Sequence, residues 1–172
     1  MKRAGCWQIA YGIESGSQKV LDILKKGINI RQIRDAVRWT KEAGISTKGF
    51  LMIGNPGETA EDIEMTRRLM LDIELDDVLV EYFTPYPGAE IYNKVKDYGT
   101  IVEREDREST FYSGFVPYGL SGEYLKKQFK SFYSQFYFRP RIILNYIVRL
   151  GNPAKIWALF LKFVSFVFRK QR

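Results

Sequence analysis

The sequence contains no histidine and a single cysteine, Cys6, among its 172 residues. One cysteine excludes an internal disulfide, and alone it cannot hold a zinc ion or an iron–sulfur cluster. Without histidine the commonest general base and metal ligand is missing. Any chemistry must therefore use carboxylates, lysines, backbone groups or a bound cofactor. No stretch matches a Walker A loop or a dinucleotide-binding GxGxxG fingerprint.

Long apolar runs are also missing. The first residues, "MKRAGCWQIAYG", hold too short an apolar run for a signal peptide, so a reducing, cytoplasmic compartment is expected. Apolar residues make up 45% of the chain, which is a globular composition. The formal net charge of +7 permits nucleic acid, anionic lipid or acidic metabolites as partners and does not choose between them; it also fits a plain solvated surface.

Three short β-rich runs alternate with helical patterns in the first hundred residues. The runs are "WQIAYGI", "TKGFLMI" and "VLVEYFT", at 7–13, 47–53 and 78–84. Such alternation predicts parallel βαβ units, whose ligands gather at the carboxyl ends of the strands. The unusual stretches "GIESGS", "IGNPGET" and "FTPYPGAE" stand at those ends.

Capping signals mark the helices between the runs. Expected helices run from Ser17 to Gly27, from a capping box at Asn29 and Gln32 to Gly44, from a box at Thr59 and Asp62, and from Ala89 to Asp97. Residues 101–120 are expected to form a loop connector. From Ser121 the pattern is helical again, with Leu125, Phe129, Phe132 and Phe136 on one face, a break before Pro140 and a last helix after "GNP".

The stretch "GFLMIGNPGET" has two readings when taken alone. Its glycines would let a ligand approach the backbone, and the helix that follows offers free N–H groups. The same residues also suit an ordinary strand-to-helix turn.

Taken together, "GIESGSQKVLDILKKG", "AGISTKGFLMIGNPGET" and "FTPYPGAEIY" resemble the second half of the radical S-adenosylmethionine (SAM) fold, most closely the branch that carries a cobalamin-binding domain. The resemblance covers roughly residues 4–99. It implies the fold class α/β: an incomplete (half) radical-SAM-type barrel in which three parallel strands with helices, the family's strands four to six, precede an α-helical C-terminal extension. The expected division is 1–100 for the half-barrel, 101–120 for the connector and 121–172 for the extension.

The resemblance also implies roles for individual residues. Glu14 would accept hydrogen bonds from the SAM ribose hydroxyls, and Lys26, twelve positions on, would pair with the SAM carboxylate. Ser15 would contact the ligand through its hydroxyl, and Met52 would lie beside adenine in the segment that ends with Gly54 and Pro56. Two plainer readings remain open: Glu14 as the N-terminal cap of the next helix, and Lys26 as a cation at that helix's C-terminus.

The chain departs from the family in lacking the three cysteines spaced CxxxCxxC, which hold the [4Fe-4S] cluster that cleaves SAM. We therefore expect a C-terminal fragment of a radical SAM enzyme, inactive alone, which contributes part of the SAM pocket. The intact enzyme would form a 5′-deoxyadenosyl radical or methylate an unactivated carbon; the resemblance leaves open whether cobalamin is a further cofactor. Alternatives are a non-catalytic interaction module or a subunit of a split enzyme; a Rossmann-like anion-binding domain fits less well.

The expected partners are the missing N-terminal half or a complementary chain and a small-molecule substrate, without nucleic acid. The last helix joins a dense aromatic face to the basic end "RKQR", which suggests peripheral contact with a membrane, although this face can also pack on the barrel. Its apolar run of about 12 residues is too short to span a bilayer, which needs about 20.

Overall fold

The computed structural model describes residues 1–102, 114–150, 157–158 and 161, and its centre is a three-stranded parallel sheet. The strands are β1 (Gln8–Glu14), β2 (Ser46–Ile53) and β3 (Asp77–Tyr82), in the order β1-β2-β3. Both pairings are parallel, and the register sets Tyr11 opposite Gly49 and Gly49 opposite Val78. The predicted sequential parallel sheet is confirmed.

The helices between the strands begin where the sequence predicts. Helix α2 (Ile30–Glu42) starts with the capping box of Asn29 and Gln32, and α3 (Ala60–Asp72) starts with the box of Thr59 and Asp62. In each box the two side chains bond reciprocally to backbone N–H groups that would otherwise lack a partner at the helix start. These caps fix the point at which the chain leaves each strand end and turns back along the sheet.

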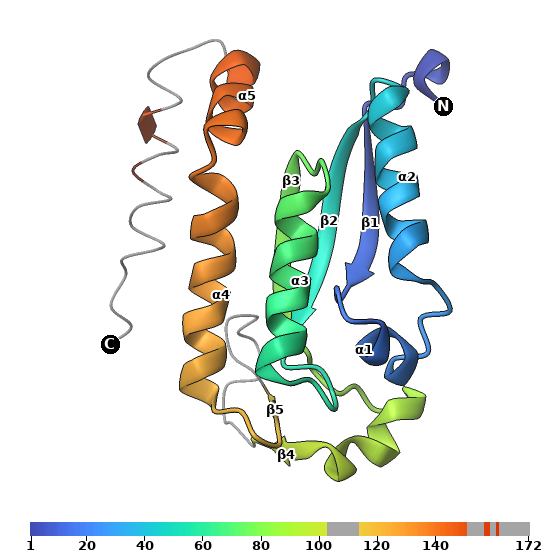
Figure 1. Cartoon of the computed structure of the whole chain (residues 1–172), viewed down its shortest axis with the longest axis vertical. Coiled ribbons are helices and arrows are strands. Elements are labelled where there is room, and N and C mark those ends of the chain that lie inside the picture. Colours follow the sequence, from blue (N-terminus) through green and yellow to red (C-terminus); the bar gives the residue numbers. More distant parts are fainter. Residues whose placement is uncertain (103–113, 151–156, 159–160, 162–172) are drawn as a thin grey trace.

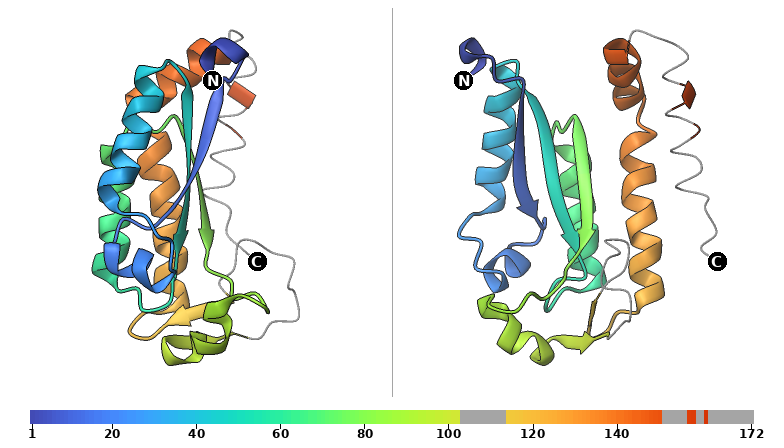
Figure 2. Two further views of the ribbon diagram at one scale, coloured as in Figure 1. Left: turned by 90° about the vertical axis from the view of Figure 1, so that its right-hand side faces the viewer. Right: turned by 180° about the vertical axis from the view of Figure 1, so that it is seen from behind.

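All the long helices lie on one face of the sheet (Figures 1 and 2). Alternate side chains of the strands, such as Ile13, Leu51 and Val80, point to this face and are buried in the main core. The opposite face carries the other set, and Phe50 on it is 36% exposed. Parallel sheets are usually covered on both faces, but no helix of the described part of the chain covers this one. We call it the uncovered face, and it is a surface suited to a partner segment or a ligand.

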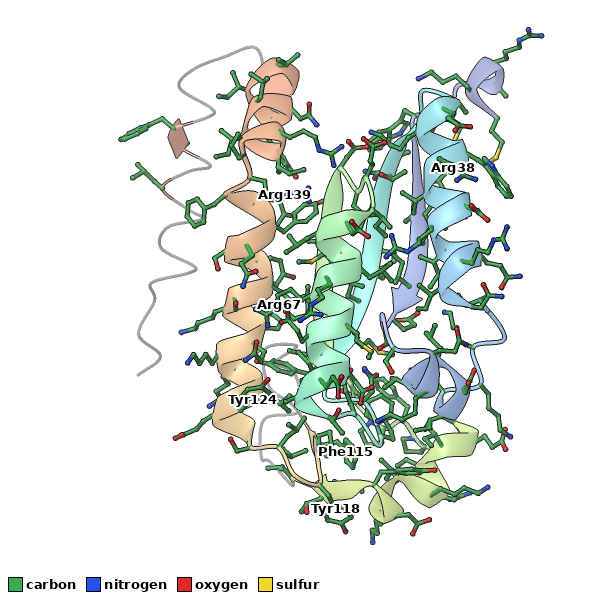
Figure 3. The ribbon with its side chains drawn as sticks, viewed as in Figure 1. Arg38, Arg67, Phe115, Tyr118, Tyr124 and Arg139 are labelled. Carbon is green, nitrogen blue, oxygen red and sulfur yellow. The ribbon has the colours of Figure 1, made fainter. Side chains whose placement is uncertain are left out.

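Two further helices extend the helical layer past β3. Helix α4 (Gly122–Tyr137) begins after its N-cap Ser121, where the helical pattern is predicted to start, and the predicted apolar face is buried; α5 (Pro140–Leu150) starts at the predicted proline. Arg67 of α3 ties α4 in place (Figure 3), since its guanidinium donates to Ser131 Oγ at 2.8 Å and lies 5.0 Å from the centre of the Phe132 ring.

Tyrosines of α4 close the free edge of β3. The hydroxyl of Tyr133 accepts a hydrogen bond from the N–H of Val80 at 3.0 Å and lies 3.2 Å from the carbonyl oxygen of the same residue. Tyr137 donates to the carbonyl of Val78 at 3.1 Å and also bonds to Asp77. An unpaired strand edge is a template for further pairing, and here side chains occupy its backbone groups. Among the described residues, no strand pairs with the outer edge of β1.

Three sequence expectations need correction. Helix α1 is Gln18–Ile23, shorter than predicted, because Lys25 turns into the left-handed region before Gly27 is reached. Residues 90–97 form a 3₁₀ helix, η2 (Glu90–Asp97), rather than an α-helix; it has no side-chain cap and buries only Val95. Because this segment is short and has few buried contacts, little stability is gained by replacing its i→i+3 hydrogen bonds with the i→i+4 bonds of an α-helix.

The connector at 101–120 is not only loop. Strand β4 (Gly99–Ile101) pairs antiparallel with β5 (Phe115–Pro117), which lies inside that range. Each strand has only three residues, which is too short for an alternation of apolar and polar side chains to be recognised in the sequence. A Cβ at Gly99 would come within 2.5 Å of the Phe115 ring, which explains the glycine at this point. Phe115 joins Phe83 and Val95 in a second small core below the sheet.

The last predicted helix falls on residues that lie outside the described part of the chain, apart from 157, 158 and 161. Within the described part, no helix is long and apolar enough to cross a bilayer.

The tyrosine closure of β3 predicts a loss of stability in the variant Tyr133→Phe. This change leaves the buried N–H of Val80 without a partner, and the expected cost is about 1–3 kcal/mol of unfolding free energy. Denaturant unfolding measures the loss, and hydrogen exchange should show faster exchange at the Val80 amide. Tyr124→Phe is the control, because the Tyr124 hydroxyl makes no hydrogen bond to any residue that the structure describes. Equal stability of the two variants would contradict the closure.

Candidate functional site

The loop after β1 holds Glu14 in a conformation that non-glycine residues seldom adopt. Its φ is 62°, and the pairing of β1 with β2 is irregular between Gly12 and Glu14. The carboxylate folds back over Gly12, where an added Cβ would lie 2.6 Å from Glu14 Oε1 and 2.9 Å from Lys26 Nζ. Gly12 is therefore required for this placement, and it explains the glycine of "YGIES".

Lys26 reaches the same point from the end of α1. The helix ends in a Schellman motif, in which the N–H of Lys26 bonds to the carbonyl of Leu21 and the N–H of Lys25 to that of Asp22. The left-handed position of this motif usually holds glycine, but here it holds Lys25, with φ of 52°. The motif brings the Lys26 ammonium to within 2.8 Å of Glu14 Oε1.

Glu14 and Lys25 are the only residues other than glycine with positive φ in the described part of the chain. Strained backbone of this kind tends to collect at functional sites. Of the two strained positions, Glu14 is one member of the ion pair, and Lys25 directly precedes the other member, Lys26. The side chains stay accessible, with 18% of Glu14 and 34% of Lys26 exposed.

Small residues after Glu14 fix this loop on α3. Ser15 is fully buried and its hydroxyl lies 3.1 Å from Thr66 Oγ1, which also accepts a hydrogen bond from the Gly16 N–H at 2.9 Å. A Cβ at Gly16 would come within 2.5 Å of the α3 backbone. The hydroxyl of Ser17 donates to Asp62 at 2.6 Å. The loop thus needs "SGS" because it lies directly against the helix.

Asp62 joins the loops that follow β1 and β2. Burial works to raise its pKa, but hydrogen bonds from Lys19, Ser17 and Thr59 outweigh burial and lower the pKa to about 2. The carboxylate is therefore ionised at neutral pH, and it holds the start of α3 against α1. Both loops are positioned by the same group.

The turn after β2 is organised around a buried carboxylate that the sequence reasoning did not single out. Glu58 accepts hydrogen bonds from the N–H groups of Gly54 and Asn55 and from the Asn55 side-chain amide, the last two at 3.0 Å. Gly54 has φ of 77°, and Gly54 and Pro56 are both buried. Asn55 Oδ1 is buried and has no hydrogen-bond partner in the described part.

Burial raises the pKa of Glu58 from 4.5 to about 7, although its hydrogen bonds with Asn55 and Gly54 work in the opposite direction. Its side chain is only 1% exposed. The sequence gives only one sign of this role, which is that Glu58 stands four residues after Gly54 in a tight turn. An exposed glutamate at the start of a helix would have the same spacing, so the sequence does not reveal the burial of Glu58.

Met52 lies on the uncovered face of the sheet, close to the ion pair. The register sets Gly12 opposite Phe50 and Glu14 opposite Leu51, so Met52 follows directly on the neighbouring strand. On the other side Met52 pairs with Glu81, which is exposed. Phe50 and Glu81 were not predicted as site residues. Period-2 alternation from Met52 sets Phe50 on the same face, whereas Glu81 reaches this face through the register of β3 with β2.

The structure therefore brings together some of the predicted residues and turns others away. Glu14 and Lys26 are in contact, and Met52 lies on the adjacent strand. The Ser15 hydroxyl points to α3, and Gly54 and Pro56 form the buried turn. Their contacts with SAM stay predictions.

The residues present do not fit an iron–sulfur cluster. The described part has no group of three or more Cys, Asp or Glu side chains that could hold a metal ion. Cys6 precedes β1, at the opposite end of the strand from Glu14, and its Sγ contacts the carbonyl of Gln8.

Glu58 predicts a pH-dependent stability. Because the folded-state pKa is raised, the stability is fully present below pH 4.5 and is lost as the pH rises through 7. The difference from 4.5 to about 7 corresponds to about 3 kcal/mol. Unfolding measured between pH 4.5 and 8 should show this slope in the wild type and in Glu61→Gln, an exposed control, but not in Glu58→Gln. A Glu58→Gln variant that keeps the wild-type slope would contradict the assignment.

Comparison with known proteins points to one superfamily. The model described as "Radical SAM superfamily" matches residues 1–70. An uncharacterized methyltransferase of Pyrococcus horikoshii is 30% identical over 146 residues, which cover 84% of this chain and 32% of the relative. A protein of Methanocaldococcus jannaschii that is named a methylthiotransferase is 39% identical over 87 residues, or 51% of this chain and 19% of the relative.

A solved structure shares the fold. Elp3 of Methanocaldococcus infernus aligns with a TM-score of 0.51 and 22% identity, over 55% of this chain and 23% of that one. The chain thus spans about a third or less of the length of these proteins. The match over residues 1–70 falls on the parallel sheet and its helices, so this part of the chain is similar to the radical SAM superfamily.

Proposed function

We propose that residues 1–100 form the second half of a radical SAM domain and supply the wall that binds the ribose and the methionyl carboxylate of SAM. The observation that carries this proposal is the Glu14–Lys26 pair, held over Gly12 by two strained backbone positions at the carboxyl end of β1. Ligands of parallel α/β folds bind at this end of the strands.

The two side chains have complementary tasks. The Lys26 contact uses Oε1 of Glu14, so Oε2 is available to accept a ribose hydroxyl. The ammonium of Lys26 carries further donors for a carboxylate, and an ammonium–carboxylate contact is a charge-assisted hydrogen bond. The carboxylate of Glu14 and the ammonium of Lys26 neutralise each other in the free site. A ligand that carries one positive and one negative charge, as SAM does at its amino acid end, would therefore meet a site without net charge.

The uncovered face would receive the base. Met52 and Phe50 offer apolar surface beside the pair, and the turn after β2 is held rigid by Glu58. The unpaired Oδ1 of Asn55 is a buried acceptor in the same turn, and buried acceptors are normally satisfied by a donor.

SAM, when bound at a reduced [4Fe-4S] cluster in intact members of the superfamily, supplies a 5′-deoxyadenosyl radical. The cysteines for that cluster must come from residues other than those of this sequence. Methyl or methylthio transfer is the activity named for two of the relatives, and transfer to a small-molecule substrate is our proposal for the complete domain. The use of cobalamin is proposed from the resemblance alone.

The open edge of β1 supports a second part of the proposal. A strand from the other half of the barrel, on the same or a complementary polypeptide, pairs with this edge, whereas the tyrosines of α4 close the edge of β3. The same edge would serve the alternative of a non-catalytic interaction module, which would bind its partner without binding SAM.

Paired substitutions test the SAM site. With the rest of the domain present, Glu14→Ala and Lys26→Ala should each weaken SAM binding by about 1–3 kcal/mol in a calorimetric titration, since each removes a charged hydrogen-bonding partner. The matched controls are Glu61→Ala and Lys94→Ala, because both side chains are exposed and neither belongs to the candidate site. Unchanged affinity in the first two variants would refute the ribose and carboxylate roles and favour the interaction module.

The open edge predicts self-association of the isolated chain. Exposed strand edges pair with other copies, so light scattering of residues 1–172 alone should detect oligomers, and adding the complementary half should dissolve them. A monodisperse monomer would count against the unpaired edge.

A further inference from the structure

The uncovered face carries one carboxylate that no charge in the described part of the chain balances. Lys48 and Asp77 form an ion pair at 3.1 Å near the start of β3, and Lys26 and Glu14 form one at 2.8 Å at the end of β1. Glu81 is exposed, and it makes no hydrogen bond or ion pair with any residue that the structure describes. The face is therefore negative overall, although the whole chain has a formal net charge of +7.

Apolar side chains lie beside this carboxylate on the same face. Glu81 pairs in register with Met52, and the preceding row of the face pairs Leu79 with Phe50. The two rows lie about 7 Å apart along the strands, since each residue advances a strand by about 3.3 Å. The Phe50 ring is 36% exposed, and the Lys48 ammonium lies 5.7 Å from its centre, so the ring already contacts one cation. The face thus combines a flat apolar platform with an unbalanced negative charge one row away.

We propose that this face binds a small molecule with an apolar ring and a protonated amine, the ring on Phe50 and Leu79 and the amine at Glu81. The proposal rests on the proposed function, because it names the substrate class of the same half-barrel. An ammonium–carboxylate contact is a charge-assisted hydrogen bond, which is the contact that Glu81 lacks in the described part of the chain. A neutral ligand would cover Glu81 without balancing its charge, which is costly, and an anionic ligand would be repelled.

The row that holds Glu81 lies beside the candidate SAM site rather than within it. Glu14 pairs with Leu51, so Met52 stands between Glu14 on β1 and Glu81 on β3. Neighbouring strands are about 4.8 Å apart, which puts the backbones of β1 and β3 about 10 Å from each other. Figure 2 shows this face of the sheet without a described helix over it. SAM at Glu14 and an amine at Glu81 can therefore be bound side by side.

Equilibrium dialysis of the full chain against small probes tests the charge preference. The probes are 1-naphthylmethylammonium, neutral 1-naphthalenemethanol and anionic 1-naphthoate, which share the same ring. At neutral pH and low salt, the cation should bind on the order of 10-fold more tightly than the alcohol, and naphthoate should bind more weakly than both. Raising the salt to about 0.5 M should reduce this preference, because added salt screens an exposed charge. Equal affinity for the cation and the alcohol, no binding of the cation, or tighter binding of naphthoate would overturn the proposal.

Substitutions assign the preference to the uncovered face. Glu81→Gln keeps the size of the side chain and removes its charge, so the cation should lose its roughly 10-fold advantage while the alcohol binds as before. Glu123→Gln on α4 should keep the wild-type preference, because Glu123 is also exposed and also lacks an ion pair in the described part. Phe50→Leu should weaken the cation and the alcohol alike, since it removes the ring on which both lie. Circular dichroism verifies that the variants are folded, and a cation preference that survives Glu81→Gln would overturn the proposal.

The dialysis contains no SAM, so its outcome is separate from the SAM titrations of the Glu14 and Lys26 variants. Unchanged SAM affinity in those variants, together with a cation preference that depends on Glu81, would refute the SAM wall and support the amine site. Weakened SAM binding in those variants, together with a cation preference that does not depend on Glu81, would overturn the amine site alone.

Discussion

The parallel pairing of β2 with a strand on each side is the constraint on which the rest of the structure depends. It brings the carboxyl ends of β1, β2 and β3 to one edge, where "GIESGS" and "GNPGET" become neighbours. Parallel strands cannot be joined by tight turns, so the chain must return through helices. The same pairing divides the side chains into a set packed under those helices and a set on the uncovered face. The candidate site belongs to the second set and the core to the first.

The two loops at that edge are held by buried ionic and polar contacts rather than by apolar packing. Asp62 connects the start of α3 with Ser17 and Lys19, and Glu58 binds the N–H groups of its own turn. Both carboxylates are almost inaccessible, and an unpaired buried charge is costly. Each loop therefore has few alternative conformations, which suits a site that must hold two charged groups, Glu14 and Lys26, at a fixed separation.

Much of this arrangement could be predicted from the sequence, because its signals are local. The capping boxes at Asn29 and Thr59, the N-cap Ser121 and the alternation of strands and helices each depend on residues a few positions apart. The choice of Glu14 and Lys26 as site residues followed from the family resemblance and the twelve-residue spacing, whereas their direct ion pair is seen only in the structure. The roles of Glu58 and Ser15 could not be predicted, since burial of Glu58 and the contact of Ser15 with Thr66, fifty-one residues away, depend on how α3 packs. The β4–β5 pair was missed for the same reason, as its strands are short and joined only in space.

The two edges of the sheet differ in a way that bears on how the domain is completed. At β3 the hydroxyls of Tyr133 and Tyr137 occupy backbone groups that a further strand would need, and this closure is built from α4, outside the segment that the family model matches. At β1 no described residue competes for the edge. The helical extension therefore prevents a further strand from pairing with β3, and it leaves the edge of β1 open for strand pairing. Because the described sheet has one edge whose backbone groups are not occupied by side chains, any further strand that extends it would pair with β1.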